Sequence, residues 1–166
     1  MSKIIKVSAV FLFCVMFSVA VNAQDAFAKG DKVIQAGIGV GSTLSGYGGA
    51  IPINASFEMC IKDNLFDEKS SIGVGGYFAF ASYRSVNFFF PGVRGAFHYQ
   101  FIDKLDTYAG LMMGIRHWRW ADHWSYTDFI IPFFAGARYY FTDNIGAFAE
   151  LGYGIAAFQF GVSFKF

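Results

Sequence analysis

Large apolar residues alternate with small or polar residues through most of this chain. The alternation is clearest at the end, where Phe158, Phe160, Val162, Phe164 and Phe166 are separated by Gln, Gly, Ser and Lys. Successive side chains of an extended strand point to opposite faces, so this segment is predicted to be a β-strand with one wholly apolar face. The same period of two predicts eight strands, at about residues 32–41, 50–62, 71–83, 88–101, 107–118, 129–141, 145–155 and 158–166.

The polarity of the two faces indicates which one meets lipid. One face of the strands is apolar, and the other carries glycines together with six charged residues: Glu58, Arg94, Arg116, Arg138, Glu150 and Lys165. A soluble barrel of the lipocalin kind would have apolar side chains inside and a well-charged surface, and six scattered charges are too few to solvate one. A strand between lipid and a polar interior matches the pattern better. The prediction is therefore an all-β, closed, eight-stranded, antiparallel, up-and-down transmembrane β-barrel, with the soluble barrel as its alternative.

Strand lengths and connections agree with this fold. The predicted strands have the length that a tilted strand needs to cross a bilayer. The second and third, fourth and fifth, and sixth and seventh strands are joined by short connections rich in Asp and Lys, whereas residues 119–128 are predicted to be the longest irregular segment. Short periplasmic turns, longer outer loops and both termini at one end are typical of outer-membrane barrels.

Composition is consistent with strands rather than membrane-spanning helices. The chain is 55% hydrophobic and 15% charged, with 22 Phe and 19 Gly. Beyond the N-terminal region, no apolar run reaches the roughly 18 residues of a transmembrane helix.

The N-terminal region predicts export. Lys3 and Lys6 precede an apolar run, and Val21-Asn22-Ala23 offers a small-residue cleavage site, so residues 1–23 are predicted to be a cleaved signal peptide, with a retained anchor as the alternative. Residues 24–31 are interpreted as a short polar periplasmic leader and residues 32–166 as the barrel. Cleavage would change the formal charge from +1 to −1, which argues against a nucleic-acid partner.

The chain resembles a group of small outer-membrane β-barrel proteins. The features that carry the resemblance are the signal-peptide pattern, the alternating strands, the segment 29–32 (Lys-Gly-Asp-Lys), the segment 148–154 (Phe-Ala-Glu-Leu-Gly-Tyr-Gly) and the final strand. They are similar to the outer-membrane-protein-A/opacity-like type and to uncharacterised barrels of the Bacteroidetes group. The resemblance implies a monomer in the Gram-negative outer membrane, surrounded by the lipid bilayer and lipopolysaccharide. It also implies that the barrel-assembly machinery recognises the final strand through Phe160, Phe164 and Phe166.

The inward charges are predicted to form a network of Glu58 and Glu150 with Arg94, Arg116, Arg138 and Lys165. Because side chains can fill the interior of an eight-stranded barrel, we interpret this network as a plug of paired charges. A gated conduit or an anion site is the alternative.

Trp118, Trp120 and Trp124 are the only tryptophans and are expected in an outer loop, as part of an aromatic girdle. A ligand-stacking platform or an adhesive loop is the alternative. His117, Asp122, His123 and Asp128 lie nearby, but their spacing matches no established zinc motif, so no metal site is predicted.

The functional hypothesis is a structural or surface-interaction role, without catalytic residues or a cofactor. One alternative is a lipid-modifying enzyme, in which His98, predicted to face the interior, would take part. The other is a narrow pore. Fold alone does not choose among these functions.

Overall fold

The computed structural model describes residues 26–42, 51–83, 85–120 and 124–166, so the predicted signal peptide lies outside the described residues. Nine strands form one antiparallel sheet: β1 (Lys32–Ser42), β2 (Ile53–Asp63), β3 (Ser70–Tyr83), β4 (Val86–Ile102), β5 (Leu105–Trp120), β6 (Ser125–Ile130), β7 (Phe133–Tyr140), β8 (Ile145–Gly152) and β9 (Ala156–Lys165). The predicted all-β architecture is confirmed. In this described part of the chain, no helix is long and apolar enough to cross a membrane.

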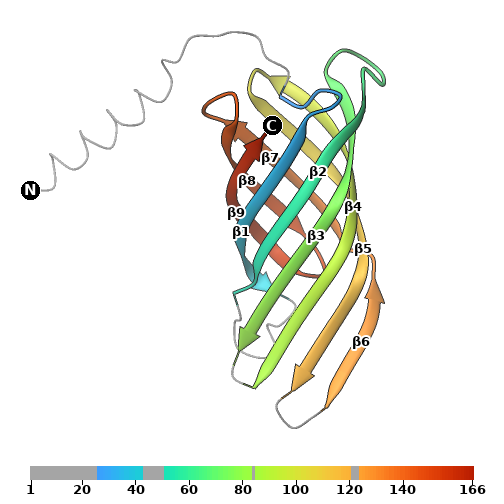
Figure 1. The fold of residues 1–166 in the computed structure, drawn as a ribbon, viewed down its shortest axis with the longest axis vertical. Helices are drawn as coiled ribbons and strands as arrows, with labels where there is room; N and C mark the ends of the chain where they lie inside the picture. The colour runs from blue at the N-terminus through green and yellow to red at the C-terminus, as the bar shows by residue number, and fades with distance from the viewer. Residues whose placement is uncertain (1–25, 43–50, 84, 121–123) are drawn as a thin grey trace, which may run out of the picture.

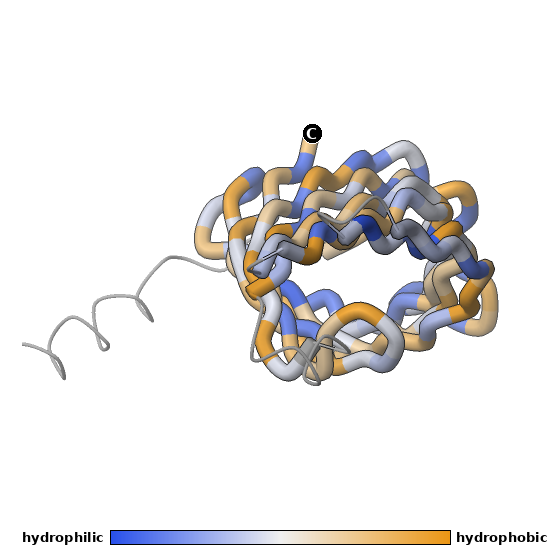
Figure 2. The backbone as a smooth tube through the Cα atoms, turned by 90° about the horizontal axis from the view of Figure 1, so that it is seen from below, coloured by the Kyte–Doolittle hydropathy of each residue, from blue (hydrophilic) through white to orange (hydrophobic). Residues whose placement is uncertain are grey.

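Hydrogen bonding between the strands returns to the strand where it starts. Along the ring, β1 pairs with β2, then β3, β4, β5, β7, β8 and β9, and β9 pairs with β1 again. The strands run steeply tilted around the ring, and the C-terminus lies at the same end as the start of β1 (Figure 1). Figure 2 looks along this ring from the opposite end.

The sixth predicted strand is interrupted. β6 and β7 both pair with β5, and Ile131 and Pro132 separate them. Proline has no N–H to donate to a ladder, and here only its carbonyl remains bonded, accepting from Met112 N at 2.8 Å. The count of nine strands instead of eight follows from this break.

The prediction of an irregular segment over residues 119–128 is wrong. β5 continues to Trp120, and residues 114–119 pair with residues 125–130. The resulting β5–β6 hairpin extends beyond the other strands at the end far from the C-terminus (Figure 1). Aromatic residues alternate here with charged residues rather than apolar with small ones, which hid the period of two from sequence reasoning.

The predicted faces of the strands are confirmed. Outward positions are widely exposed, such as Leu111 at 56% and Val162 at 63%, whereas Glu58 and Arg138 point inward and are 0% exposed. Hydrophobic and hydrophilic residues follow one another at short intervals along much of the tube in Figure 2. The outside of the ring is its apolar side.

The interior holds two different layers. Toward the end of the β5–β6 hairpin, an apolar cluster packs inside the ring, made of Tyr77, Ala79, Ala81, Val86, Phe88, Phe90, Ala96, Tyr108, Met112, Trp118, Phe134 and Ile155. Charged side chains occupy the part nearer the start of β1 and the C-terminus, which we call the termini end of the ring. The alternation along the strands predicted the inward charges but not the aromatic layer.

Residues 26–31, the described part of the predicted periplasmic leader, pack against the ring. Ala26 and Phe27 are buried, and Phe27 packs with Val33 and Cys60. Backbone atoms tie the segment to the ring: Ala26 N donates to Gln100 Oε1 at 2.7 Å, and Phe27 O accepts from Ser71 Oγ at 3.1 Å. The segment lies over the charged layer at the end of the ring. This position is stabilising because the side chains of Ala26 and Phe27 are removed from water there.

Candidate functional site

Six charged or titratable side chains meet inside the ring, and we call them the buried charge cluster. They come from β2, β4, β5, β7 and β8, and they are Glu58, Arg94, His98, Asp106, Arg138 and Glu150. Each occupies an inward position of its strand, so the period of two and the ring of pairings bring them together.

Four members form a closed set of contacts. His98 Nε2 lies 3.0 Å from Glu58 Oε1, and His98 Nδ1 lies 2.9 Å from Asp106 Oδ1. Arg138 joins the same two carboxylates, donating from Nε to Asp106 at 2.7 Å and from Nη2 to Glu58 at 3.0 Å. Each imidazole nitrogen faces a carboxylate oxygen, an arrangement that an imidazolium with two N–H donors satisfies.

Arg94 and Glu150 extend the cluster toward the apolar layer. Arg94 Nη2 donates to Glu150 Oε1 at 2.9 Å, and the hydroxyl of Tyr108 donates to the same oxygen at 2.8 Å. The Arg94 guanidinium also lies 4.1 Å from the ring centroid of Phe134. Charged groups buried this deeply are retained only when they are paired.

A glycine leaves the room that the cluster needs. A Cβ on Gly73 would stand 2.6 Å from Glu58 Oε1 and 2.9 Å from His98 Nε2. Any larger residue at this inward position would displace the contact between the two side chains.

The structure divides the predicted charge network. Glu58, Arg94, Arg138 and Glu150 meet in the cluster. Arg116 instead pairs with Asp128 across the β5–β6 hairpin, with Nε donating to Oδ1 at 3.0 Å. Lys165 lies at the termini end, where Nζ is 3.7 Å from Asp31 Oδ2.

Two members of the cluster were missed. Asp106 was predicted to lie in a turn, but β5 begins at Leu105, which places Asp106 at an inward position. His98 was predicted to face the interior but was not joined to the charges. Asp106 precedes Tyr108, Gly110 and Met112 at intervals of two, and this spacing was the available signal.

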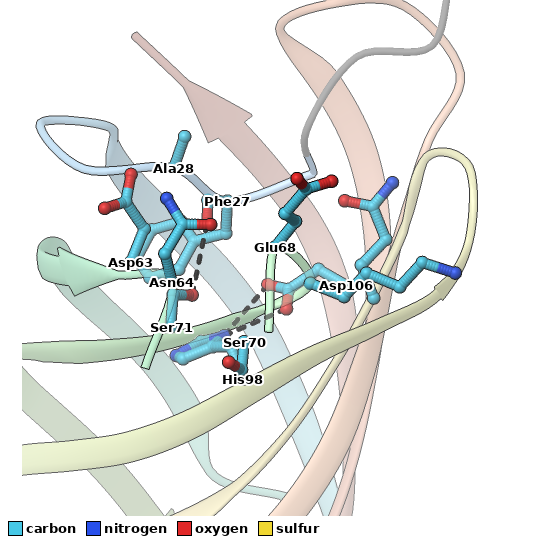
Figure 3. Close-up of a pocket in the computed structure, with 11 residues that line it drawn as sticks. Phe27, Ala28, Asp63, Asn64, Glu68, Ser70, Ser71, His98 and Asp106 are labelled. Carbon is cyan, nitrogen blue, oxygen red and sulfur yellow. Dashed lines mark hydrogen bonds and ion pairs between the residues drawn. The ribbon is translucent and has the colours of Figure 1, made fainter. Parts of the chain in front are cut away.

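The cluster is nearly closed to solvent at the termini end. A small cavity of about 20 Å³ lies there, lined by Phe27, Ser71, His98 and Asp106 among others (Figure 3). That volume holds about one water molecule. Ser71 Oγ donates to the carbonyl of Phe27 rather than to His98, so no serine–histidine pair is formed.

Aromatic side chains gather at the other end of the molecule. The aromatic groove, as we name it, is lined by Arg116, Trp118, Trp120, Trp124 and Tyr126 and has a volume of about 340 Å³. Trp118 and Trp120 belong to β5 and not to a loop, and Trp118 is buried against Phe88, so it is not a girdle residue. Trp124 is 60% exposed.

Among the described residues, no three His, Cys, Asp or Glu side chains are placed to hold a metal ion. Of the four candidates near the hairpin, His117 contacts Thr127 Oγ1 at 2.8 Å and Asp128 pairs with Arg116, while Asp122 and His123 lie outside the described residues.

Transmembrane barrels are among the solved structures that share this fold. A de novo designed transmembrane β-barrel matches with a TM-score of 0.55 and 17% identity, over 83% of this chain and 97% of the design. Ail, the attachment invasion locus protein of Yersinia pestis, matches with a TM-score of 0.55 and 13% identity, over 83% of this chain and 99% of Ail. The structure of Ail in a phospholipid bilayer nanodisc matches with a TM-score of 0.52 and 16% identity, over 83% of this chain and 100% of that one.

No protein-family model and no curated protein matches the chain. The similarity to the solved barrels therefore concerns the fold.

Proposed function

We propose that this chain is an integral outer-membrane protein, a closed up-and-down β-barrel with a structural or surface-interaction role. Its barrel has eight strands when β6 and β7 are counted as one interrupted strand. The observation that carries the proposal is the polarity of the ring, with an apolar outside around a buried charge cluster. The fold shared with membrane barrels supports it.

The apolar outside needs a solvent other than water. Outward residues on every part of the ring are exposed and apolar, including Ile34, Phe57, Phe78, Val93, Leu111, Phe133, Leu151 and Val162. Exposed apolar patches of this extent on a water-soluble monomer would promote association. A lipid bilayer accommodates them and requires the ring to be closed, because lipid cannot bond to a free strand edge.

A blocked interior is the second part of the proposal. The buried charge cluster and the apolar cluster fill successive layers, and Phe27 covers the charged layer at the termini end. The narrow-pore alternative predicts steady single-channel conductance in planar bilayers, whereas a blocked barrel stays silent.

A non-catalytic role is favoured by the setting of His98. It is buried, and both of its ring nitrogens contact carboxylates, so neither is directed at a substrate. The surface role is assigned to the β5–β6 hairpin, which extends beyond the ring (Figure 1). Ail is an attachment invasion locus protein by its name, and the analogy to it rests on fold alone.

The orientation follows the resemblance to outer-membrane barrels. We place the termini and the Asn64–Lys69 turn on the periplasmic side and the hairpin outside, next to lipopolysaccharide, with the signal peptide directing export. Phe160, Phe164 and Phe166 lie on the outer face of the last strand and would meet the barrel-assembly machinery there. A monomer is expected, because β1–β5 and β7–β9 pair around the ring and, among the described strands, only the short β6 has an unpaired edge.

The test combines folding and topology. Protein refolded in detergent is expected to show a mobility shift on boiling, and β-type circular dichroism before boiling. Ser125→Cys on β6 is then expected to react with a membrane-impermeant maleimide on intact cells. Glu68→Cys, in the β2–β3 turn, is the matched control and should react only after the cells are lysed.

A protein that shows no mobility shift and stays soluble without detergent would contradict the membrane proposal. Labelling of Glu68→Cys on intact cells, with Ser125→Cys protected, would reverse the orientation. Cys60 is buried and gives little background.

A further inference from the structure

The aromatic groove combines flat apolar surfaces with a paired cation and anion. Trp118 and Trp120 stack at 6.0 Å between ring centroids, Trp124 and Tyr126 at 6.4 Å, and Trp120 meets Trp124 edge-on at 4.7 Å. The Arg116–Asp128 pair borders them, with the guanidinium 5.7 Å from the Trp118 ring centroid. Arg116 lines the groove, and Asp128, which pairs with it from the neighbouring strand, balances its charge.

The groove opens on the inner side of the hairpin. The register pairs Trp118 with Tyr126 and Arg116 with Asp128, so these four side chains share one face. It is the same face on which Met112 and Trp118 join the apolar cluster inside the ring. Ligand sites of β-barrels occur preferentially in such mouths.

The opposite face of the hairpin shows that this part lies beyond the apolar belt. Toward its tip this face carries His117, Arg119 and Thr127, with His117 bonded to Thr127, whereas Ile115 and Phe129, nearer the ring, are apolar like Leu111 and Met113. Polar and charged side chains on the outer face indicate contact with water, not with acyl chains. The groove is therefore open to the aqueous phase.

We propose that the aromatic groove binds a neutral oligosaccharide of pyranose units from the external solution. This inference rests on the proposed function, because it requires the hairpin to face outward. The electron-rich face of an aromatic ring attracts the C–H face of a sugar ring. Each sugar hydroxyl both donates and accepts; in the lining of the groove, the Arg116 guanidinium donates and the Tyr126 hydroxyl accepts. Because Asp128 neutralises Arg116, the groove favours a neutral sugar over a sulfated or phosphorylated one. The volume of about 340 Å³ lies within the range of small-molecule sites.

The experiment uses the reporters that the groove contains. All three tryptophans of the chain are Trp118, Trp120 and Trp124, so fluorescence excited selectively from tryptophan, and not from the nine tyrosines, reports this site. The refolded barrel, in a detergent without a sugar headgroup, is titrated with cellotetraose, chitotetraose and maltotetraose. A saturable fluorescence change with at least one of them is expected, with a dissociation constant on the order of 1 mM.

Substitutions locate the binding. Tyr126→Ala keeps every tryptophan and is expected to weaken binding at least about tenfold. Trp124→Ala removes one of the fluorophores, so its binding is measured by calorimetry, and the same weakening is expected. Phe66→Ala, at an exposed aromatic in the opposite turn, is the control and leaves binding unchanged.

Three results would overturn the inference. The first is no saturable change with any of the three sugars. The second is binding that Tyr126→Ala leaves within about twofold of the parent. The third is a fluorescence change with lipopolysaccharide that none of the sugars competes away, which would identify a membrane component as the occupant. If the mobility shift on boiling is present while the sugars do nothing, only this inference fails, and the proposed function stands.

Discussion

At the scale of single residues, the buried charge cluster is the feature that others depend on. Glu58 contacts His98 and Arg138 at 3.0 Å each, and Arg94 lies 4.0 Å away. Three cationic or protonatable groups would therefore lose their shared partner if this carboxylate were removed. A buried charge without a partner is far more costly than an exposed one.

We expect Glu58→Gln to lower the free energy of unfolding by about 3–5 kcal/mol, because Arg138 and His98 then remain buried beside a neutral amide. The measurement is urea unfolding of the barrel folded in lipid vesicles. Asp128→Asn is the matched control. This substitution breaks the partly exposed pair with Arg116, and it should lower the free energy of unfolding by less than about 1 kcal/mol. Equal losses of unfolding free energy in the two variants would show that the contacts of Glu58 stabilise the protein no more than the Arg116–Asp128 pair does.

At the scale of elements, strand spacing depends on particular glycines. A Cβ on Gly75 would lie 1.8 Å from the carbonyl oxygen of Phe57 on the neighbouring strand β2. A contact this short with backbone cannot be relieved by rotating a side chain, so β2 and β3 would have to separate. Gly76 is its neighbour in the same strand, and its Cβ would meet nothing closer than 3.9 Å.

Gly75→Ala is accordingly expected to reduce the folded fraction severely, whereas Gly76→Ala folds like the parent. The ratio of the unboiled, fast-migrating band to the total protein on electrophoresis measures both. The two substitutions add the same methyl group one residue apart, so propensity alone would affect them equally. Similar yields from both would contradict the argument from close approach.

The segment before β1 acts as a cover. The side chain of Phe27 is 6% exposed. The centroid of its ring lies 4.4 Å from the ring centroid of His98 and 4.8 Å from the guanidinium carbon of Arg138. It also packs beside Cys60, whose thiol is buried. The reactivity of this thiol therefore reports whether the cover is in place.

Phe27→Ala should speed the reaction of Cys60 with a small maleimide by at least about tenfold, since water and reagent gain access from the termini end. The second cysteine, Cys14, lies in the predicted signal peptide and is absent from the mature chain used for the assay. Phe66→Ala, in the adjoining turn, is the control and leaves the rate unchanged. An unchanged rate in Phe27→Ala would mean that other groups protect the thiol.

At the scale of the whole molecule, the outer face decides which solvent the protein needs. Leu111 lies in the middle part of β5, is 56% exposed and pairs with Gly95 and Phe133 on the two adjacent strands. In water, a charge at such a position would cost little. In the middle of a bilayer it costs about 2–4 kcal/mol.

Leu111→Arg is therefore expected to destabilise the barrel in lipid vesicles by about 2–4 kcal/mol. Phe66→Arg, in the exposed β2–β3 turn, should leave stability close to that of the parent. Urea titrations of vesicle-folded protein provide the comparison. A Leu111→Arg variant as stable as the parent would be evidence against a lipid-facing position.

Much of the architecture followed from local pattern. The period of two assigned residues such as Phe57 and Val162 to the outside, and Glu58 and Arg138 to the inside, because a strand alternates its side chains whatever it later packs against. The same alternation placed seven of the eight predicted strands within three residues of their observed bounds. Pro132 could have predicted the break between β6 and β7, since its missing N–H is a local property.

Other features depended on the tertiary structure. Which inward charges meet depends on strand register and ring closure, so Arg116 and Lys165 fell outside the cluster while Asp106 and His98 joined it. The burial of Phe27 and the aromatic layer around Phe88 likewise arise from contacts between residues far apart in the chain. The sequence by itself determined the faces of the strands, because the covalent geometry of a strand sets them. Only the closed ring decided the partners across the interior, because these depend on the relative positions of eight strand segments at once.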